Sequence, residues 1–203
     1  SEAAGIFGSE IGFGLGISVS DLNDDMLPDM YVSNDFWERD YLYINKGDGS
    51  FVEDIISRTG VISASSMGSD VADLDNDGKA EIFTTEMLPG DNVRLKTMTR
   101  FDETNIKELK VRSSYHYQHM QNCIQWNYGD GNFQELASLL NVEATDWSWG
   151  SLLFDMDNDG RKDILVANGI YRDITNMDFA DFVADRENIK KIVLEKGKFD
   201  FED

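Results

Sequence analysis

Three short acidic segments carry the side chains of this chain that are best suited to metal chemistry. They read DLNDDMLPD at 21–29, DLDNDGKAE at 73–81 and DMDNDGRKD at 155–163. Side chains with oxygen donors recur at positions 1, 3, 5 and 9, and the carbonyl of position 7 can join them if the segment curls around one point. Calcium accepts about six to eight oxygen ligands in irregular geometry, so the pattern predicts calcium loops.

The predicted ligands are the side chains at positions 1, 3, 5 and 9 and the carbonyl at position 7. They are Asp21, Asn23, Asp25, Leu27 and Asp29; Asp73, Asp75, Asp77, Lys79 and Glu81; and Asp155, Asp157, Asp159, Arg161 and Asp163. Magnesium demands a stricter octahedral geometry, and the segments offer no imidazole or thiolate to zinc or copper. We expect two to three structural Ca²⁺ ions, at most one for each segment.

The three segments differ at position 6, where the loop needs a left-handed turn. Gly78 and Gly160 allow that turn, whereas Met26 in the first segment adopts it at a cost of about 1 kcal/mol. Asn23 also replaces a carboxylate. We therefore expect 155–163 to be the strongest site and 21–29 the weakest, with Glu81 reaching farther than an aspartate in the middle one.

Two other interpretations of the acidic segments were weighed. An EF-hand requires a glutamate at position 12 and flanking helices, but position 12 is Val32, Thr84 or Val166 and the flanks have strand composition. Simple acidic turns without metal would have to tolerate strong repulsion among their carboxylates. Calcium loops that stabilise the fold remain the favoured interpretation.

The elements around these segments repeat. LGISVSDLNDDMLPDMYVSN, MGSDVADLDNDGKAEIFTTE and WGSLLFDMDNDGRKDILVAN align without gaps, from Leu15, Met67 and Trp149. NKGDGSF from Asn45 and NYGDGNF from Asn127 form a second repeated motif, typical of a hairpin. Each unit reads as four strands, which predicts an all-β fold of β-propeller blades with about three repeats.

The repeats also set the expected boundaries within one repeat domain, 1–203. A partly helical insertion is expected at about 87–121, and the tail FADFVADRENIKKIVLEK has apolar residues at helical spacing. A closed propeller needs more blades, so other blades of a longer chain are expected partners. The expected parts are blade 1 at 12–56, blade 2 at 64–140, the first half of blade 3 at 146–176 and a helical insertion or tail at 177–203.

Composition limits the partners. The formal charge of −21 disfavours nucleic acid and anionic membranes as partners. A single cysteine, Cys123, forbids an intrachain disulfide, and no segment is long and apolar enough to span a bilayer. No signal peptide is visible at the start of the sequence.

The acidic loops, the aromatic-glycine pairs Phe13–Gly14 and Trp149–Gly150 and the N-x-G-D-G-x-F hairpins resemble FG-GAP/VCBS repeats, the blades of integrin-α-type propellers. Strings such as YVSND and TNMDF are similar to bacterial, Bacteroidetes-like VCBS-repeat proteins related to the ASPIC/UnbV propeller family. The resemblance implies calcium-binding blades in a secreted, periplasmic or cell-surface protein whose partners are proteins or glycans.

A ligand is expected at the end of the blades opposite the acidic loops, where the long variable connections lie. Trp37, Asp146 and Trp147 are the candidate ligand residues there, while His116 and His119 lack an acidic third ligand. We favour a non-enzymatic binding module, because no nucleophile or phosphate-loop motif is present. The alternatives are a calcium-dependent polysaccharide lyase or hydrolase, or its binding domain, and a purely structural scaffold.

Overall fold

The computed structural model describes residues 2–8, 10–98, 104–171 and 175–196. Residues 99–103 of the predicted insertion, 172–174 of the predicted third blade and 197–203 of the predicted tail lie outside the described residues. The chain divides into two compact units. The first comprises the described parts of 1–89 and 102–169, and the second those of 90–101 and 170–203.

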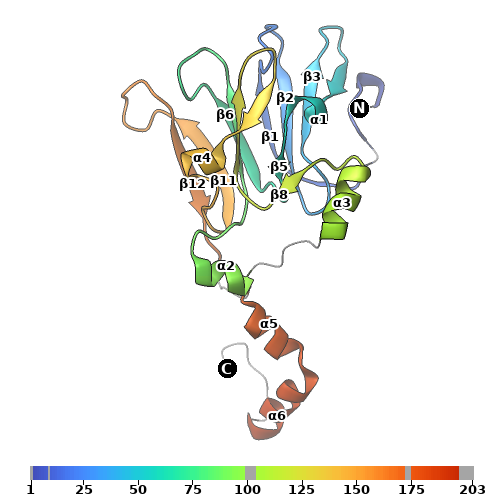
Figure 1. Ribbon diagram of the computed structural model, residues 1–203, viewed down its shortest axis with the longest axis vertical. Helices are drawn as coiled ribbons and strands as arrows, with labels where there is room; N and C mark the ends of the chain where they lie inside the picture. Colours follow the sequence, from blue (N-terminus) through green and yellow to red (C-terminus); the bar gives the residue numbers. More distant parts are fainter. Residues whose placement is uncertain (1, 9, 99–103, 172–174, 197–203) are drawn as a thin grey trace. The chain divides into compact units, whose positions relative to one another are not determined.

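The first sheet has four antiparallel strands in the order β1-β2-β3-β4 (Figure 1). Each strand pairs with the next one along the chain, so every connection is a hairpin. The central strand β3, YLYIN, is apolar over four successive residues, all of them buried, so both of its faces are covered. The bounds are β1 Phe13–Ser20, β2 Asp29–Asp35, β3 Tyr41–Asn45 and β4 Phe51–Glu53.

The second sheet repeats this topology, with the order β10-β9-β7-β6. Its first two strands flank the second acidic segment, and the insertion separates β7 from β9. The bounds are β6 Gly68–Ala72, β7 Glu81–Thr85, β9 Cys123–Asn127 and β10 Phe133–Glu135.

The third sheet has two antiparallel strands, β11 Ser148–Phe154 and β12 Asp163–Asn168. The prediction of four-stranded antiparallel sheets with some helix is confirmed for the first two sheets. Among the described residues the sheets do not close into a ring, so the closed propeller stays a prediction.

Helices lie between and after the sheets, and the apolar tail motif is helical as predicted. In the first unit they are η1 Glu2–Ala4, α1 Ile55–Arg58, α3 Thr104–Arg112 and α4 Ala137–Leu140. In the second unit they are α2 Asn92–Met98, α5 Met177–Ala184 and α6 Arg186–Lys196. No helix in the described ranges has the length and apolar character needed to cross a membrane.

One pairing was not expected from the sequence. β5 Ile62–Ser63, in the connection between the sheets, pairs in parallel with β8 Gln118–His119, at the end of the insertion. Both strands have only two residues, so no alternation of residue types could reveal them. The pairing fastens the described end of the insertion to the body of the first unit.

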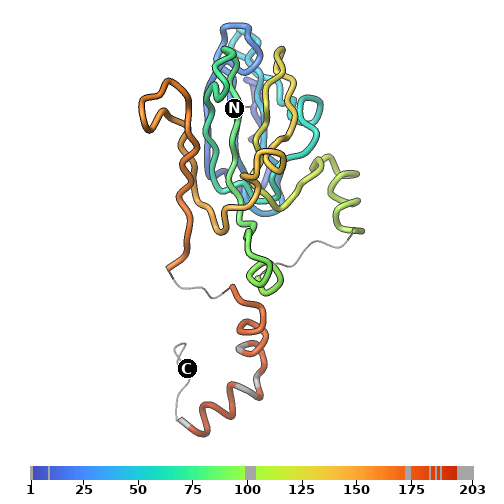
Figure 2. The backbone as a smooth tube through the Cα atoms, turned by 60° about the vertical axis from the view of Figure 1, so that its left-hand side comes forward, coloured from blue at the N-terminus to red at the C-terminus, as the bar shows by residue number. Residues whose placement is uncertain are grey.

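The first strands of the three sheets, β1, β6 and β11, lie side by side in that order (Figure 2). Glycines make this approach possible. A Cβ on Gly16 would lie 3.1 Å from the backbone nitrogen of Ser69, and one on Gly68 would lie 3.0 Å from the carbonyl oxygen of Trp149. Real Cβ atoms avoid such distances, so Gly16 and Gly68, each the second residue of its aligned repeat, allow the backbones of neighbouring sheets to meet.

Two apolar clusters fill the spaces between the sheets. Burial of these side chains supplies most of the favourable free energy of folding. The cluster between the first and second sheets contains Leu22, Tyr31, Leu42, Ile44, Ile55, Ile62, Ile82 and Phe133. The cluster between the second and third contains Phe83, Ile124, Ala137 and Leu153.

Hydrogen bonds also join neighbouring sheets. The Ser18 hydroxyl donates to the Ser69 carbonyl over 3.1 Å, and the Leu153 backbone N–H donates to Asp70 Oδ2 over 2.8 Å.

The fully buried Asp40 accepts hydrogen bonds from the Tyr31 and Ser66 hydroxyls, both at 2.6 Å. Even so, burial raises the pKa of Asp40 to about 6, because desolvation outweighs these favourable contacts.

Glu86 lies just after β7 and is 1% exposed. Its Oε2 accepts a hydrogen bond of 2.6 Å from the Met87 backbone N–H. Burial, with a smaller contribution from the charge of Asp35, raises the pKa of Glu86 to about 8. The folded protein therefore keeps a proton on Glu86 over a pH range in which the unfolded chain has lost it.

This shift predicts that Glu86→Gln flattens the dependence of stability on pH. Because the pKa is raised on folding, the contribution of Glu86 is favourable below its ordinary pKa and is lost as pH rises to about 8. The wild-type free energy of unfolding should fall relative to the variant by on the order of 4 kcal/mol across this range. Urea unfolding at several pH values, in constant calcium, measures the difference.

The exposed Glu108, which pairs with Arg112 on α3, provides the matched control. Glu108→Gln should leave the wild-type pH dependence unchanged. Parallel curves for wild type and Glu86→Gln would contradict the protonated state of Glu86 in the fold.

Candidate metal centres

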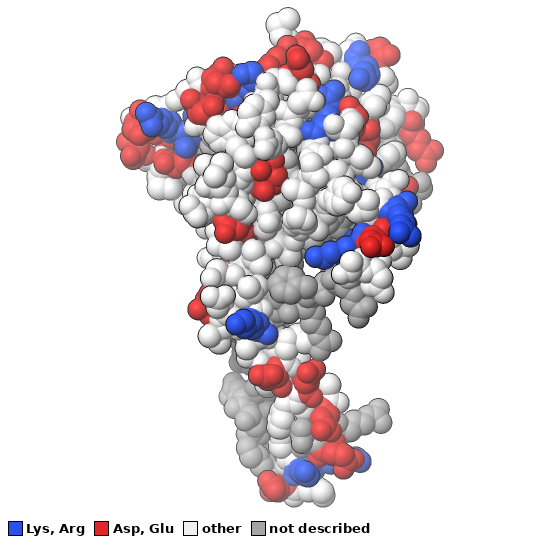
Figure 3. Space-filling view, viewed as in Figure 1, with Lys and Arg blue, Asp and Glu red and all other residues white. Residues whose placement is uncertain are grey.

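Each acidic segment connects the first two strands of one sheet. The last acidic residue of each segment, Asp29, Glu81 or Asp163, is also the first residue of the second strand. These connections lie at the same end of the first unit as the hairpins β3–β4 and β9–β10 (Figure 1). Acidic side chains gather over this loop end (Figure 3). The topology therefore collects all three segments on one side.

The three segments share one backbone conformation despite their different sequences. In each, the first aspartate accepts hydrogen bonds from the backbone N–H groups of positions 5 and 6. For Asp73 these donors are Asp77 and Gly78, at 3.1 and 2.9 Å, and for Asp155 they are Asp159 and Gly160, at 3.0 and 2.9 Å. The corresponding distances for Asp21 are 3.2 and 2.7 Å. The curl assumed from the sequence is therefore present.

Left-handed backbone conformations close the curl at two positions. Position 6 has φ of 65° at Met26, 91° at Gly78 and 87° at Gly160. The left-handed turn expected at Met26 is thus present, and the backbone of this exposed residue adopts a conformation that favours glycine. Position 4, which the sequence analysis missed, also has a positive φ, and it is occupied by the tolerant residues Asp24, Asn76 and Asn158.

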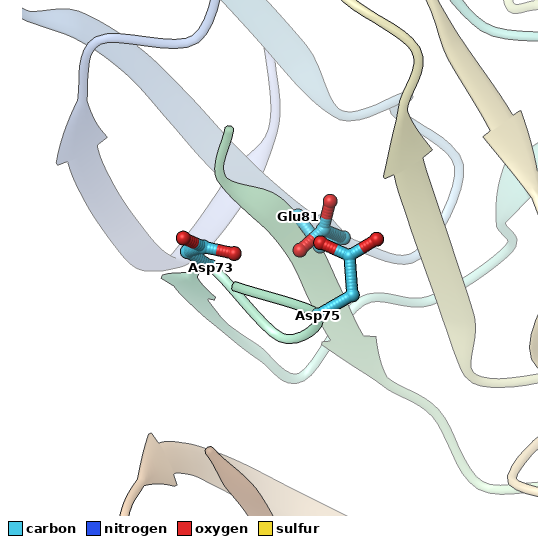
Figure 4. A group of neighbouring side chains, drawn as sticks. All are labelled: Asp73, Asp75 and Glu81. Carbon is cyan, nitrogen blue, oxygen red and sulfur yellow. The ribbon is translucent and has the colours of Figure 1, made fainter. Parts of the chain in front are cut away.

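Carboxylates converge in the second and third segments. Asp73, Asp75 and Glu81 each offer one oxygen, and these oxygens lie within 4.8 Å of one another. Figure 4 shows the carboxylates of Asp75 and Glu81 close together, with Asp73 beside them. The equivalent residues Asp155, Asp157 and Asp163 form the same arrangement. Positions 1, 3 and 9 are thus brought together as predicted.

Position 5 does not belong to either group of converging oxygens. Asp77 instead accepts hydrogen bonds from the Lys79 backbone N–H at 2.8 Å and from Lys79 Nζ at 2.5 Å. Asp159 likewise accepts from the Arg161 backbone N–H at 2.8 Å. These contacts hold position 7, whose carbonyl was a predicted ligand, next to position 5.

In the second segment, Glu81 is a buried carboxylate close to two other acidic side chains. It is fully buried, and its Oε2 accepts a hydrogen bond of 2.8 Å from the Leu74 backbone N–H. Its Oε1 is buried as well but has no hydrogen-bond partner of normal geometry among the described residues. Burial and the nearby charges of Asp75 and Asp73 raise the pKa of Glu81 to about 7. A cation would satisfy this oxygen and offset the repulsion.

The first segment differs at the equivalent position. Asp29 is fully buried too, but its two oxygens accept hydrogen bonds from the backbone N–H groups of Leu22 and Asn45, at 3.0 and 2.8 Å. The Asn23 side chain donates to Asp25 Oδ2 over 3.1 Å. Among the described residues, three acidic oxygens do not converge in this segment. The rank of this segment as the weakest site stays a prediction.

The asparagine that opens each Gly-Asp-Gly hairpin positions the loops, a role that the sequence analysis did not assign. The Asn127 side-chain amide donates to the carbonyls of Leu22 and Ala80, at 3.1 and 3.2 Å. It thereby joins the first acidic segment to the second. Among the described residues, the Asn45 amide donates to the Pro28 carbonyl alone, at 3.0 Å. The repeated N-x-G-D-G motif was the available signal for this role.

At the opposite end, the candidate ligand residues lie in separate places. Trp37, in the connection between β2 and β3, packs against the ring of Tyr115, and Lys110 Nζ lies 4.6 Å from its ring centroid. Asp146 and Trp147 lie just before β11, where the Trp147 ring packs against Trp149 at 6.3 Å. Trp37 remains 45% exposed, whereas Trp147 is half-buried.

The two histidines do not share an environment. His116 is buried, and its Nε2 lies 3.2 Å from the Thr59 hydroxyl and 3.1 Å from the Thr59 carbonyl. Burial lowers its pKa, which favours the neutral ring. His119 is exposed on β8. Among the described residues, the groups of converging metal-binding side chains contain neither histidine.

A family model described as "FG-GAP-like repeat" matches residues 21–84 and 112–166, which together make up more than half of the chain. The matched spans contain all three acidic segments, and the unmatched stretch between them contains α2 and most of α3. No curated protein matches the chain.

The strain at position 6 predicts that Met26→Gly stabilises the protein. Glycine adopts the observed φ of 65° without the clash of a Cβ, so the free energy of unfolding should rise by about 0.5–1 kcal/mol. Denaturant unfolding measures the change. Met156, an exposed methionine without a left-handed backbone, is the control, and Met156→Gly should be destabilising. Equal effects of the two changes would argue against strain at Met26.

The bridge made by Asn127 predicts a larger cost for Asn127→Ala than for Asn45→Ala. Both changes remove the acceptor of a hairpin N–H, but only the first leaves the carbonyls of Leu22 and Ala80 without this donor. We expect a loss of about 2 kcal/mol for Asn127→Ala and less than about 1 kcal/mol for Asn45→Ala. Thermal and urea unfolding test the order, and a reversed order would show that the bridge contributes little.

Proposed function

Because this chain belongs to the FG-GAP-like repeat family, we propose that it is a calcium-stabilised module of the β-propeller type that binds a protein or glycan partner. In this proposal calcium is structural and takes no part in a reaction. The acidic segments 73–81 and 155–163 hold the ions most firmly, and 21–29 holds one more weakly or not at all.

The buried Oε1 of Glu81, which has no hydrogen-bond partner of normal geometry among the described residues, supports the metal proposal. A buried carboxylate oxygen that is so poorly satisfied is costly, and two further carboxylates lie close to it. The donor set contains only oxygen, which suits calcium better than zinc or copper. Asp73, Asp75 and Glu81 would hold one ion, and Asp155, Asp157 and Asp163 another.

A bound ion would connect the end of one strand to the start of the next. In the second sheet the ligands come from the segment that leaves β6 and from the first residue of β7. Neutralising the carboxylates removes their mutual repulsion, and fixing the segment anchors the β6–β7 pair. Calcium binding would therefore contribute directly to the stability of the folded state.

We further infer that additional blades cover the two open faces of the first unit. β1 exposes alternate apolar side chains, among them Ile17 at 62%, and β11 exposes Leu152 at 56%. Gly16 and Gly68 each meet the backbone of a neighbouring strand, whereas a Cβ on Gly150 would meet nothing within 4 Å. The geometry at Gly150 thus suits the first strand of another blade.

The setting and the partner follow from the same proposal. A calcium-dependent fold suits a secreted, periplasmic or cell-surface protein, because calcium is abundant outside the cytoplasm. The likeness to bacterial, ASPIC/UnbV-related propellers stays a prediction. Partner binding is proposed for the end opposite the acidic loops, where Trp37 is exposed.

The calcium proposal predicts that EDTA lowers the melting temperature and that added Ca²⁺ restores it by mass action. Mg²⁺ at the same concentration should restore less, since it requires a stricter geometry. Differential scanning calorimetry at several Ca²⁺ concentrations gives the size of the shift. Melting temperatures that respond to neither EDTA nor Ca²⁺ would refute the proposal.

Two variants assign the effect to the sites. Glu81→Gln and Asp157→Asn each remove a charge from a converging group, so both should reduce the stabilisation by Ca²⁺. Asp48→Asn, in the exposed β3–β4 hairpin, removes an equal charge away from these groups and is the matched control. Equal losses in all three variants would indicate a general effect of net charge.

A further inference from the structure

A cavity of about 170 Å³ opens between the β2–β3 connection and the chain just after α3. Its walls include Phe7, Glu38, Arg39, Tyr41, Ser114 and Tyr115. These residues come from three separate stretches of the first unit, all outside the acidic segments. The cavity is large enough for one small ring or a few water molecules.

Three of the residues that line the cavity have polar side chains and are more than nine-tenths buried. Glu38 is 7% exposed, and Arg39 and Tyr41 are 8% exposed. The hydroxyl of Tyr41 is buried, and its polar neighbour is the Glu38 carboxylate, although this contact lacks normal hydrogen-bond geometry. Burial, followed by the adjacent charge of Glu38, raises the pKa of Tyr41. A buried hydroxyl whose hydrogen bond is so poorly aligned is uncommon and often marks a site that a ligand or water completes.

Arg39 lines the cavity, and its guanidinium already has partners within the protein. Its guanidinium pairs with Glu53 at 2.6 Å and donates to the carbonyls of Ser114 and Asp40, at 3.1 and 3.2 Å. Its charge is also packed 5.1 Å from the ring centroid of Tyr41. The one cation in the wall is therefore neutralised by its own partners, so the cavity is poorly suited to an anionic ligand.

The rest of the wall offers hydrogen-bond acceptors and aromatic surface. The carboxylates of Glu38 and Glu10 face a ligand that donates hydrogen bonds, and the Ser114 hydroxyl can donate or accept. The wall thus offers hydrogen-bond acceptors and donors beside aromatic faces. A neutral ligand with several hydroxyls fits this wall, because hydroxyls donate to carboxylates and accept from Tyr41.

An exposed ring extends the site beyond the cavity. Trp37 packs edge-on against Tyr115, a wall residue, with the ring centroids 6.2 Å apart. Ser114, in the wall stretch just after α3, has φ of 65°, a strained conformation for a residue with a side chain. Such strain persists only where the surroundings enforce it, and it frequently accompanies binding sites.

We propose that this cavity binds one neutral sugar residue, with Trp37 as a platform for the next unit of an oligosaccharide. The aromatic rings cover the apolar face of the sugar, and Glu38 and Tyr41 bind its hydroxyls. This inference rests on the proposed function only in that the module binds a partner. It does not depend on calcium.

The test is titration of the full chain with glucose, galactose, mannose and N-acetylglucosamine and their short neutral oligosaccharides, followed by calorimetry and saturation-transfer NMR. Galacturonic and glucuronic acids are the charged counterparts. At least one neutral sugar should bind saturably, and its uronic acid should bind about tenfold more weakly. Absence of saturable binding by every neutral sugar, or equal binding of the acids, would overturn the proposal.

Variants locate the binding. Glu38→Gln and Tyr115→Ala should weaken the affinity about tenfold, while Glu108→Gln and Tyr128→Ala, at exposed positions elsewhere, should leave it within about twofold of wild type. Glu38→Gln keeps the side-chain shape, so it remains informative if Tyr115→Ala unfolds. Wild-type affinity in Glu38→Gln would overturn the site. Measuring the melting temperature with and without EDTA in the same samples separates a failure of this site from a failure of the calcium proposal.

Discussion

The approach of three backbones at β1, β6 and β11 is the constraint on which the first unit depends. Side chains would keep these strands apart, but Gly16 and Gly68 let the sheets stack closely enough to bury the two apolar clusters. Stacking in this order also brings the three acidic segments to one end of the unit. The close packing at the glycines and the crowding of negative charge thus result from the same arrangement. The repulsion between the carboxylates must be offset if the sheets are to stay packed.

The residue at position 9 differs between the first and second acidic segments in how its buried carboxylate is hydrogen-bonded. Asp29 is short enough for both oxygens to reach backbone N–H groups, so the first segment satisfies its buried acid internally. Glu81 is one methylene longer, and its Oε1 is left without a partner of normal geometry among the described residues. Glutamate at position 9 departs from the aspartate of the other two segments, yet its poorly satisfied Oε1 favours a metal at this site.

Repetition made much of the fold predictable. Aligned strand patterns and the N-x-G-D-G motifs were sufficient to anticipate two four-stranded antiparallel sheets and the curl of the acidic segments. Single, non-repeated contacts were not predictable, because one sequence contains no signal for them. The β5–β8 pair belongs to this group. The bridge of Asn127 and the positive φ of position 4 lie instead in repeated motifs, but the motifs do not state which contact or conformation they encode. The exposed Trp37 was expected, but the cavity beside it depends on the insertion, whose position no local pattern reveals.

The bridge made by Asn127 has a thermodynamic consequence for neighbouring blades. Its amide holds the carbonyls of Leu22, in one acidic segment, and Ala80, in the next. A cation that orders one of these segments would also hold the Asn127 amide in place. Ordering the other segment would then cost less conformational entropy. Coupling of this kind is reciprocal, so the two segments influence each other equally. Loops that look like independent repeats would fill cooperatively, and the module would respond to calcium more steeply than a set of separate sites.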